Sequence, residues 1–421
     1  MTSNITIELK LSTPASIGWY NPNIQDPLGL RPAEIKGLWR WWCRTCIAGA
    51  MYELGLLKGL STSDIFLKPS KEEVKAISCF VGKILGLGYA GEKDSEASRF
   101  KIYIEAKEDI KSNIIELATL RNLQRAVLLT LDKRGRQQVR GINKGFKFTL
   151  VVSKRISKPK YLEAEELAIK ILYLALQFSG VGKGARRGMG SLDITSIKVD
   201  GREQSIPRNI SELLDEVYNK CRKIVEEYCS ECIDSSKTRH QVKNHSIPPI
   251  PVLSKSKYQN IYLTQVYIVR GVNFEDVHNF FARPTRCRVL YKTPICKDYL
   301  RNKHYAWVLG LPRTQHETGY FIGNKGKIRS EVSRRPSPIM VSYHSNENIF
   351  GDGVFITTFF SGDWPTHMEW RSPSQKPRET REKSVSINVN PQTLLDAYVT
   401  AINELSNYLN KVRARIVASW P

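Results

Sequence analysis

The sequence predicts an α+β fold built from two tandem ferredoxin-like units with insertions. Over the first half, apolar residues at strand and helix spacing follow the order strand, helix, strand, strand, helix, strand, which is the ferredoxin-like order. A polar, Pro-rich stretch at 235–257 separates this half from a second block rich in strands. The 421 residues are enough for two domains with real cores. We expect domains at 1–200 and 258–421, with a helical connector and linker at 201–257.

The elements of the first half are predicted from apolar periodicity and from helix start signals. The first helix has Pro32 just ahead of it, and proline is favoured at helix starts. In chain order we expect a strand at 5–11, a loop with four prolines at 13–32, a helix at 33–57, a Gly-rich, short-stranded segment at 78–91, strands at 99–106 and 146–152, a helix at 163–178, a strand at 191–199 and a connecting helix at 211–233.

The second half is less regular, and it lacks a clear first helix. Its order fits a second, more irregular ferredoxin-like unit. We expect strands at 260–270, 305–311, 339–343 and 354–360, a short helix at 274–281, an exposed loop at 362–384 and a closing helix at 391–417.

The segment 180–191, GVGKGARRGMGS, combines five glycines with three cations in twelve residues. Such a backbone is free to press against an anion. It follows a helix and precedes a strand, whereas a Walker loop or a dinucleotide fingerprint requires strand, loop, helix. Its residues also fit neither pattern, so a nucleotide-binding P-loop is not expected. Two interpretations stay open: a loop that grips a polyphosphate backbone, and a tight helix C-cap and turn.

The charge of the chain predicts an anionic partner. The net charge is +23 and the pI is about 9.6, an excess that is most often associated with nucleic acid. The segment 133–162 contains ten cations and no acid. A solvated surface normally mixes the two signs, so we interpret this segment as a basic, mobile loop that leads into a strand.

The predicted first helix has two distinct faces. At about 100° per residue, Leu38, Trp39, Trp42, Cys46 and Ala50 fall within about 60° of Ile35 and form the core stripe. On another face Lys36, Arg40 and Arg44 stack one turn apart, and Trp41 lies apart from both sets. Like charges in a row destabilise a helix unless an anion meets them. The row is either three solvated cations or a basic ridge along nucleic-acid phosphates, with Trp41 available for a base or a protein partner.

The candidate RNA-binding residues come from these three basic segments, and we expect the first helix and the Gly-rich loop to form one surface. We expect no catalytic residue, no metal and no cofactor. The candidates are Lys36, Arg40, Arg44, Arg136, Arg140, Lys144, Lys183, Arg186 and Arg187.

The cysteines do not predict a metal site. The CxxC pairs Cys43–Cys46 and Cys229–Cys232 are expected inside helices and far apart, whereas zinc ribbons place such pairs in turns. Cys221, Cys229 and Cys232 fall at helical spacing with apolar residues, which indicates buried thiols. Eight cysteines in so long a chain are not a disulfide scaffold. No apolar run approaches the roughly 20 residues of a membrane helix and no signal pattern is present, so we expect a soluble, cytoplasmic protein.

Three motifs resemble one known family. Residues 30–42, LRPAEIKGLWRWW, resemble the first-helix signature of the RAMP proteins of CRISPR effector complexes, in which a Pro-led start precedes (K/R)-G-x-x-R. The WRWW form is most similar to the family of first subunits of the Cmr complex, the type III-B effector. Residues 182–190 resemble the RAMP G-loop, and 334–339, RRPSPI, resemble a motif in the second half of that subunit. The match is poorer at 79–97, where LGLGY replaces a Phe-Gly-Ser type of turn.

The resemblance implies two RRM-like domains and a subunit that holds guide RNA and target RNA at one end of a multi-subunit filament during antiviral defence. Its partners would be the other Cmr-complex RAMP subunits, with no membrane. RAMP subunits that cut RNA have an Asp six positions ahead of an Asp-Pro pair, and this chain has Tyr20 ahead of Asp26-Pro27. The cutting acid is therefore missing, and Pro27 indicates that Asp26 forms a turn and caps backbone amides.

Two rival functions are considered. One is a metal-independent RNase of the same fold that processes guide precursors, and such enzymes usually use a His in the first domain. Residues 1–239 contain no His, and the seven histidines that follow are scattered. The other rival is a nucleic-acid-binding structural protein outside CRISPR, against which the combined first-helix and G-loop pattern argues.

Overall fold

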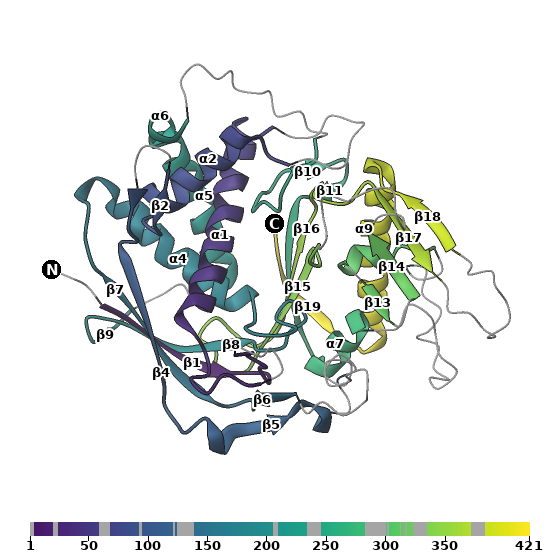
Figure 1. The fold of residues 1–421 in the computed structure, drawn as a ribbon, viewed down its shortest axis with the longest axis horizontal. Coiled ribbons are helices and arrows are strands. Elements are labelled where there is room, and N and C mark those ends of the chain that lie inside the picture. Colours follow the sequence, from purple (N-terminus) through teal and green to yellow (C-terminus); the bar gives the residue numbers. More distant parts are fainter. Residues whose placement is uncertain are drawn as a thin grey trace.

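The computed structural model describes residues 4–19, 24–58, 68–91, 95–120, 123, 139–204, 209–233, 246–282, 300, 303–311, 313–315, 318–322, 335–371 and 384–421 (Figure 1). The described chain is a mixed α+β structure whose sheets are antiparallel. No described helix is long and apolar enough to cross a membrane.

The first half is organised around one antiparallel sheet with the strand order β4-β7-β1-β8-β9. Ile7 of β1 lies opposite Leu150 of β7 and Ile197 of β8, so all three apolar side chains share the buried face. The elements that build this half are β1 (Asn4–Leu11), α1 (Pro32–Glu53), β4 (Phe100–Ala106), β7 (Lys147–Lys154), α4 (Leu162–Phe178), β8 (Leu192–Val199), β9 (Arg202–Glu203) and α5 (Ile210–Glu227).

The helices α1, α4 and α5 lie on the same side of this sheet and pack against one another (Figure 1). Trp39 of α1 donates its indole N–H to the Ala168 carbonyl of α4, at 2.6 Å. Insertions surround this unit. They are α2 (Lys71–Cys79), a π-helix (Phe80–Ile84), the pairs β2 (Tyr89–Ala90) with β3 (Ser95–Glu96) and β5 (Ile114–Glu116) with β6 (Arg140–Ile142), three 3-10 turns (Lys111–Asn113, Leu117–Thr119 and Pro159–Tyr161) and α6 (Cys229–Cys232).

The second half repeats the element order and the strand order of the first. Its main sheet runs β15-β16-β12-β19, so the first, second, third and fourth strands along the chain occupy the same relative places as β1, β4, β7 and β8. These elements are β12 (Thr264–Arg270), α7 (Phe274–Ala282), β15 (Ile339–His344), β16 (Gly353–Phe359), α9 (Pro391–Lys411) and β19 (Arg415–Trp420).

A second small sheet is inserted into this half, with the order β13-β14-β17-β18. Further short elements complete it. They are β10 (Lys257–Tyr258), β11 (Ile261–Tyr262), a 3-10 helix (Ala306–Leu309), β13 (Arg313–Gln315), β14 (Thr318–Ile322), β17 (His367–Arg371) and β18 (Ser384–Asn388).

Most predicted elements are confirmed, but several predictions, most of them in the second half, are wrong. Residues 78–91 are mainly the end of α2 and a π-helix, because Phe80 and Ile84 bury their side chains against α1. Residues 305–311 hold a 3-10 helix, not a strand. The expected exposed loop at 362–384 contains β17, with Met368 buried. The closing helix ends at Lys411, and the chain then adds the edge strand β19.

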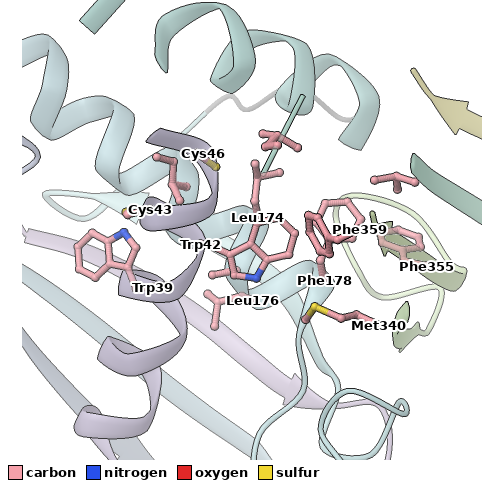
Figure 2. Close-up of a cluster of buried hydrophobic side chains, with 14 of the residues drawn as sticks. Trp39, Trp42, Cys43, Cys46, Leu174, Leu176, Phe178, Met340, Phe355 and Phe359 are labelled. Carbon is pink, nitrogen blue, oxygen red and sulfur yellow. The ribbon is translucent and has the colours of Figure 1, made fainter. Parts of the chain in front are cut away.

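The two halves share one hydrophobic core. The indole of Trp42 on α1 packs against Phe178 at the end of α4 and against Phe359 of β16, with ring centroids 5.6 and 5.9 Å away (Figure 2). Phe178 in turn contacts Phe355 at 5.8 Å. The first helix therefore packs against the second sheet as well as against its own.

A buried polar network joins the halves beside this core. His344 of the second half places Nδ1 3.1 Å from Asp193 Oδ1 and Nε2 2.7 Å from the Gln177 carbonyl. Ser345 donates its backbone N–H and its hydroxyl to the same Asp193 carboxylate. Asn348 donates to the Gln177 side-chain oxygen at 2.7 Å. These polar groups of the two halves therefore satisfy one another.

The cysteines differ in part from prediction. Cys43 and Cys46 are buried in α1 as expected, and burial raises the pKa of both thiols. The helix predicted at 211–233 breaks at Tyr228, and Cys232 is not a free thiol: it forms a disulfide with Cys79 that connects α6 to α2. Cys229 is only partly buried.

Candidate nucleic-acid interface

The exposed side of α1 carries a row of cations. We call Lys36, Gly37, Arg40 and Arg44 the α1 strip; at about 100° per residue they span about 100° of the helix circumference. Gly37 and Arg44 are exposed, while Lys36 and Arg40 are half-buried. The opposite side of α1 is the predicted core stripe, with Trp39, Trp42 and Cys46 buried. The strip is thus held in place by the packing behind it.

A fourth cation, Arg155, lies beside this strip. Its backbone N–H donates to the Arg99 carbonyl at 2.8 Å, which places it just beyond the end of β7. Burial lowers the pKa of Lys36, and the nearby charges of Arg40 and Arg155 lower this pKa further. The Arg40 guanidinium donates to the Leu87 carbonyl. Arg155 was absent from the predicted site because nothing in the sequence spacing connects it to α1.

The other cations of the basic segment 133–162 are partly neutralised by the fold. Lys154 pairs with the buried carboxylate of Glu165, Lys158 lies 2.8 Å from Glu96, and Lys160 lies 2.8 Å from Glu231. None of these acids is close in the sequence. Within the described residues, no carboxylate forms an ion pair with Lys36, Arg40, Arg44 or Arg155. The cations of the α1 strip and Arg155 therefore differ from Lys154, Lys158 and Lys160, whose charges are paired within the fold.

The Gly-rich loop is folded against the protein's own backbone. An isolated bridge between Gly180 and Ser191 closes it. Gly182 and Gly190 have positive φ angles of 75° and 66°, and a Cβ at either position would lie 2.3 Å or less from a carbonyl oxygen. Internal packing thus already requires these glycines, and this favours the turn interpretation for the loop backbone.

The loop lies next to α1, as expected. The Gly182 backbone N–H donates to Glu34 Oε1 at 2.6 Å, one turn from the start of the helix. Burial raises the pKa of Glu34, while the Gly182 hydrogen bond and Arg31 act to lower this pKa. Lys183 donates its backbone N–H to the Ser16 carbonyl, and burial lowers the pKa of its side chain.

Arg186 differs from the prediction, because it is directed into the junction between the halves. Its guanidinium lies over the Trp41 ring, 4.9 Å from the centroid, and donates to the Ser337 carbonyl at 3.3 Å. Burial and the neighbouring Arg335 lower the pKa of Arg186 to about 10, against an opposing effect of Asp363. Arg186 is therefore a packing residue here.

Trp41 and Arg187 are also used inside the protein. Trp41 packs edge-on against Trp42 and Phe359, with ring centroids 5.4 and 5.7 Å away, so part of its ring is already used within the protein. Arg187 forms a parallel bridge with Val341, and its carbonyl lies 3.1 Å from His278 Nδ1.

The candidates of the basic loop lie apart from α1. Arg140 begins β6 and Lys144 follows it, and both are exposed. Because Ile142 pairs with Ala15, this segment follows the loop between β1 and α1. Arg136 lies outside the described residues.

Asp26 has a structural role, as its Asp-Pro context predicts. It is 1% exposed, and its Oδ1 accepts the Leu28 backbone N–H at 2.8 Å. Its Oδ2 lies 3.5 Å from Arg31 Nε. Tyr20, which stands where RAMP subunits that cut RNA have an Asp, lies outside the described residues. No three His, Cys, Asp or Glu side chains of the described chain are grouped so that they could hold a metal ion.

Comparison with known proteins identifies the first half. The RAMP superfamily model matches residues 10–193, which include α1, β4, β7, α4 and the Gly-rich loop and end at the start of β8. The first half of the chain is thus similar to the RAMP superfamily. None of the curated proteins is a detectable relative of this chain.

Among solved structures, a chain of the type III-B Cmr-beta complex bound to cognate target RNA and AMPPnP matches with a TM-score of 0.51 and 15% identity, covering 97% of this chain and 99% of that one. Cmr1 from Pyrococcus furiosus matches with a TM-score of 0.45 and 18% identity, over 94% and 96% of the two chains. A further chain, from Cmr-beta bound to cognate target RNA, has a TM-score of 0.45 and 14% identity, over 96% and 100%. At 15% identity, the match to the first of these chains shows that the two chains share a fold.

Buried arginines hold both the motif at 334–339 and the turn at 85–89. In the motif at 334–339, Arg335 is buried, with its guanidinium 4.4 Å from the Trp364 ring centroid and 2.8 Å from Asp363. Arg334 lies outside the described residues. The turn that departs from the RAMP pattern is held by Arg99, which donates to the carbonyls of Lys83 and Ile84 at 2.7 and 2.6 Å.

Proposed function

We propose that this protein is a non-catalytic RNA-binding subunit of a type III-B CRISPR (Cmr) effector complex. In this role it holds guide RNA and target RNA during antiviral RNA interference, beside the other RAMP subunits of the complex. The RAMP match over 10–193 and the fold shared with a chain of Cmr-beta support this proposal.

The observation that carries RNA binding is the α1 strip with Arg155. These cations have no described carboxylate partners, although the neighbouring Lys154, Lys158 and Lys160 are all paired. A row of uncompensated cations on a rigid helix is suited to a phosphate backbone, which is where most contacts of nucleic-acid-binding proteins are made. The net charge of +23 favours the same partner.

We infer that both halves are ferredoxin-like units, with the domain limits expected at 1–200 and 258–421. The support is the strand order, because β4-β7-β1-β8 and β15-β16-β12-β19 place equivalent strands in equivalent positions. The helices α7 and α9 occupy the chain positions of α1 and α4. The fold thus offers a repeated unit, and the α1 strip and Arg155 lie in its first copy.

The absence of catalysis is proposed from two features of the first half. The Asp26 carboxylate is buried and is bound to Leu28 N–H and Arg31, so it supports the loop between β1 and α1. The first 239 residues contain no His that could serve as a general acid or base.

One experiment separates this function from its rivals. The tagged chain is purified from its cells, and the bound nucleic acid is sequenced. We expect guide RNA with repeat-derived ends, together with other Cmr subunits. The purified chain is then incubated with labelled guide precursor and with guide plus target RNA, with and without divalent metal. Bound chromosomal DNA alone would contradict the proposal, and specific cleavage of the guide precursor would make the chain a processing RNase.

A further inference from the structure

Gly37 is a glycine in the second turn of α1 that packing does not require. A Cβ at this position would meet nothing within 4 Å, and its φ is not in the left-handed region. The other glycines in described helices are explained by close backbone contacts. A Cβ at Gly49 would lie 2.0 Å from the Leu253 carbonyl oxygen, and one at Gly82 would lie 2.6 Å from the Gly88 carbonyl oxygen. Glycine inside a helix is less stable than alanine, so Gly37 weakens α1 without a compensating contact in the protein itself.

Gly37 lies next to the cations of α1, none of which has a described carboxylate partner. Lys36 and Arg40 flank it on the helix, and Arg44 lies two turns further on. Arg155 is close enough to Lys36 to lower the pKa of its ammonium group. The Arg40 side chain is held by the Leu87 carbonyl, so its charge is fixed beside the glycine. A bare stretch of helix backbone therefore lies beside positioned cations.

We propose that Gly37 is the point at which the RNA sugar-phosphate backbone lies directly against α1, beside the Lys36 and Arg40 side chains. Without a side chain at this position, a phosphate can approach the helix surface more closely and reach both cations at once. The inference rests on the proposed RNA-binding function and names the contact point within it.

The test adds volume at Gly37 and compares stability with affinity. In the full-length protein, Gly37→Ala and Gly37→Leu are measured beside Asn219→Leu, which adds similar apolar bulk to an exposed position on α5. The probe is a fluorescein-labelled single-stranded RNA of mixed sequence, followed by anisotropy. We expect Gly37→Ala to raise the Tm of the free protein by about 1–3 °C, because alanine is the better helix former.

We expect the same substitution to weaken RNA binding about tenfold through steric exclusion, with a larger loss for Gly37→Leu. Asn219→Leu should bind like the wild type. Unchanged affinity in both Gly37 variants would overturn the inference, as would a loss of Tm that parallels the loss of binding. If the wild type itself fails to bind the RNA at low salt, the proposed function is overturned, and this contact with it.

Discussion

The guanidinium of Arg186 lies over the indole ring of Trp41, 4.9 Å from its centroid. Arg186 belongs to the Gly-rich loop and Trp41 to the first helix, and both contact the second half, through Ser337 and Phe359. The pair therefore connects the loop, the helix and the second sheet at one point. This use of Arg186 separates it from Lys36 and Arg40, with which the sequence grouped it.

Replacing Arg186 should mainly lower the stability of the fold, and should lower RNA binding less directly. Arg186→Ala removes the cation–π contact and a partly buried hydrogen bond, which together are worth about 1–3 kcal/mol. Urea denaturation measures the change, with Arg44→Ala as the control, because Arg44 is exposed and its loss should stay within about 0.5 kcal/mol. Equal unfolding midpoints for the two variants would show that the Trp41 contact does not stabilise the protein.

The salt dependence of RNA binding should identify the cations that contact phosphate. For the double variant Arg40→Ala with Arg155→Ala, we expect the slope of log K against log salt to fall by about 1.4, since each lost phosphate contact on single-stranded nucleic acid contributes about 0.7. The matched control is Lys220→Ala with Lys223→Ala, where each Lys pairs with an acid. Identical slopes for the two double variants would place the RNA elsewhere.

The buried carboxyl of Glu34 predicts a specific pH effect on stability. Burial raises its pKa above the ordinary value of 4.5. A carboxyl with a higher pKa in the folded state binds its proton more tightly when folded, so it favours folding at low pH, and this contribution is lost as pH rises from about 4.5 through the raised pKa.

Glu34→Gln keeps an oxygen for the Gly182 N–H without the charge. The free energy of unfolding of Glu34→Gln minus that of the wild type should therefore increase as pH rises through this window. Glu34→Ala should be less stable than both at all pH values, because it leaves the Gly182 N–H without its acceptor. Chemical denaturation between pH 4 and pH 8, a range that begins near the ordinary pKa of a carboxyl, measures the free energy of unfolding of both variants and of the wild type. A constant difference between Gln and wild type would contradict the assignment.

Asp193 should be essential for joining the two halves. Asp193→Ala leaves the Ser345 N–H, the Ser345 hydroxyl and the His344 ring without their acceptor, and breaking such a buried network costs about 3 kcal/mol or more. Glu203→Ala, at an exposed position, is the control. The unfolding midpoint and the rate of limited proteolysis would both report the loss, and matching values for the two variants would show that the network is dispensable.

The sequence predicted the main sheets well because their strands alternate and their helices have strong apolar stripes. The first helix, its core stripe and its exposed cations all follow from a 3.6-residue period that the structure reproduces. The failures have tertiary causes. Phe80 and Ile84 continue a helix because α1 offers them a buried surface, and β19 forms because β12 has a free edge. Neither partner is local, so neither could be inferred from composition.

The candidate site was predicted in part, for a similar reason. Cations at i, i+4 and i+8 on one helix can be counted along the chain, whereas ion pairs such as Lys154–Glu165 and Lys160–Glu231 form only after folding. Arg155 lies beside Lys36 because β7 ends there. Arg186 is directed inward because its guanidinium contacts the second half. Which cations keep an unpaired charge is therefore decided only by the folded structure.

Ultraviolet crosslinking of the full-length protein to bound RNA, with the crosslinked peptides identified by mass spectrometry, tests the central claim most directly. We expect crosslinks in the peptide that contains Lys36 to Arg44 and in the peptide that contains Arg155, and we expect both to be lost when Arg40 and Arg155 are replaced. Crosslinks confined to the second half, with the α1 peptide unmodified, would contradict it.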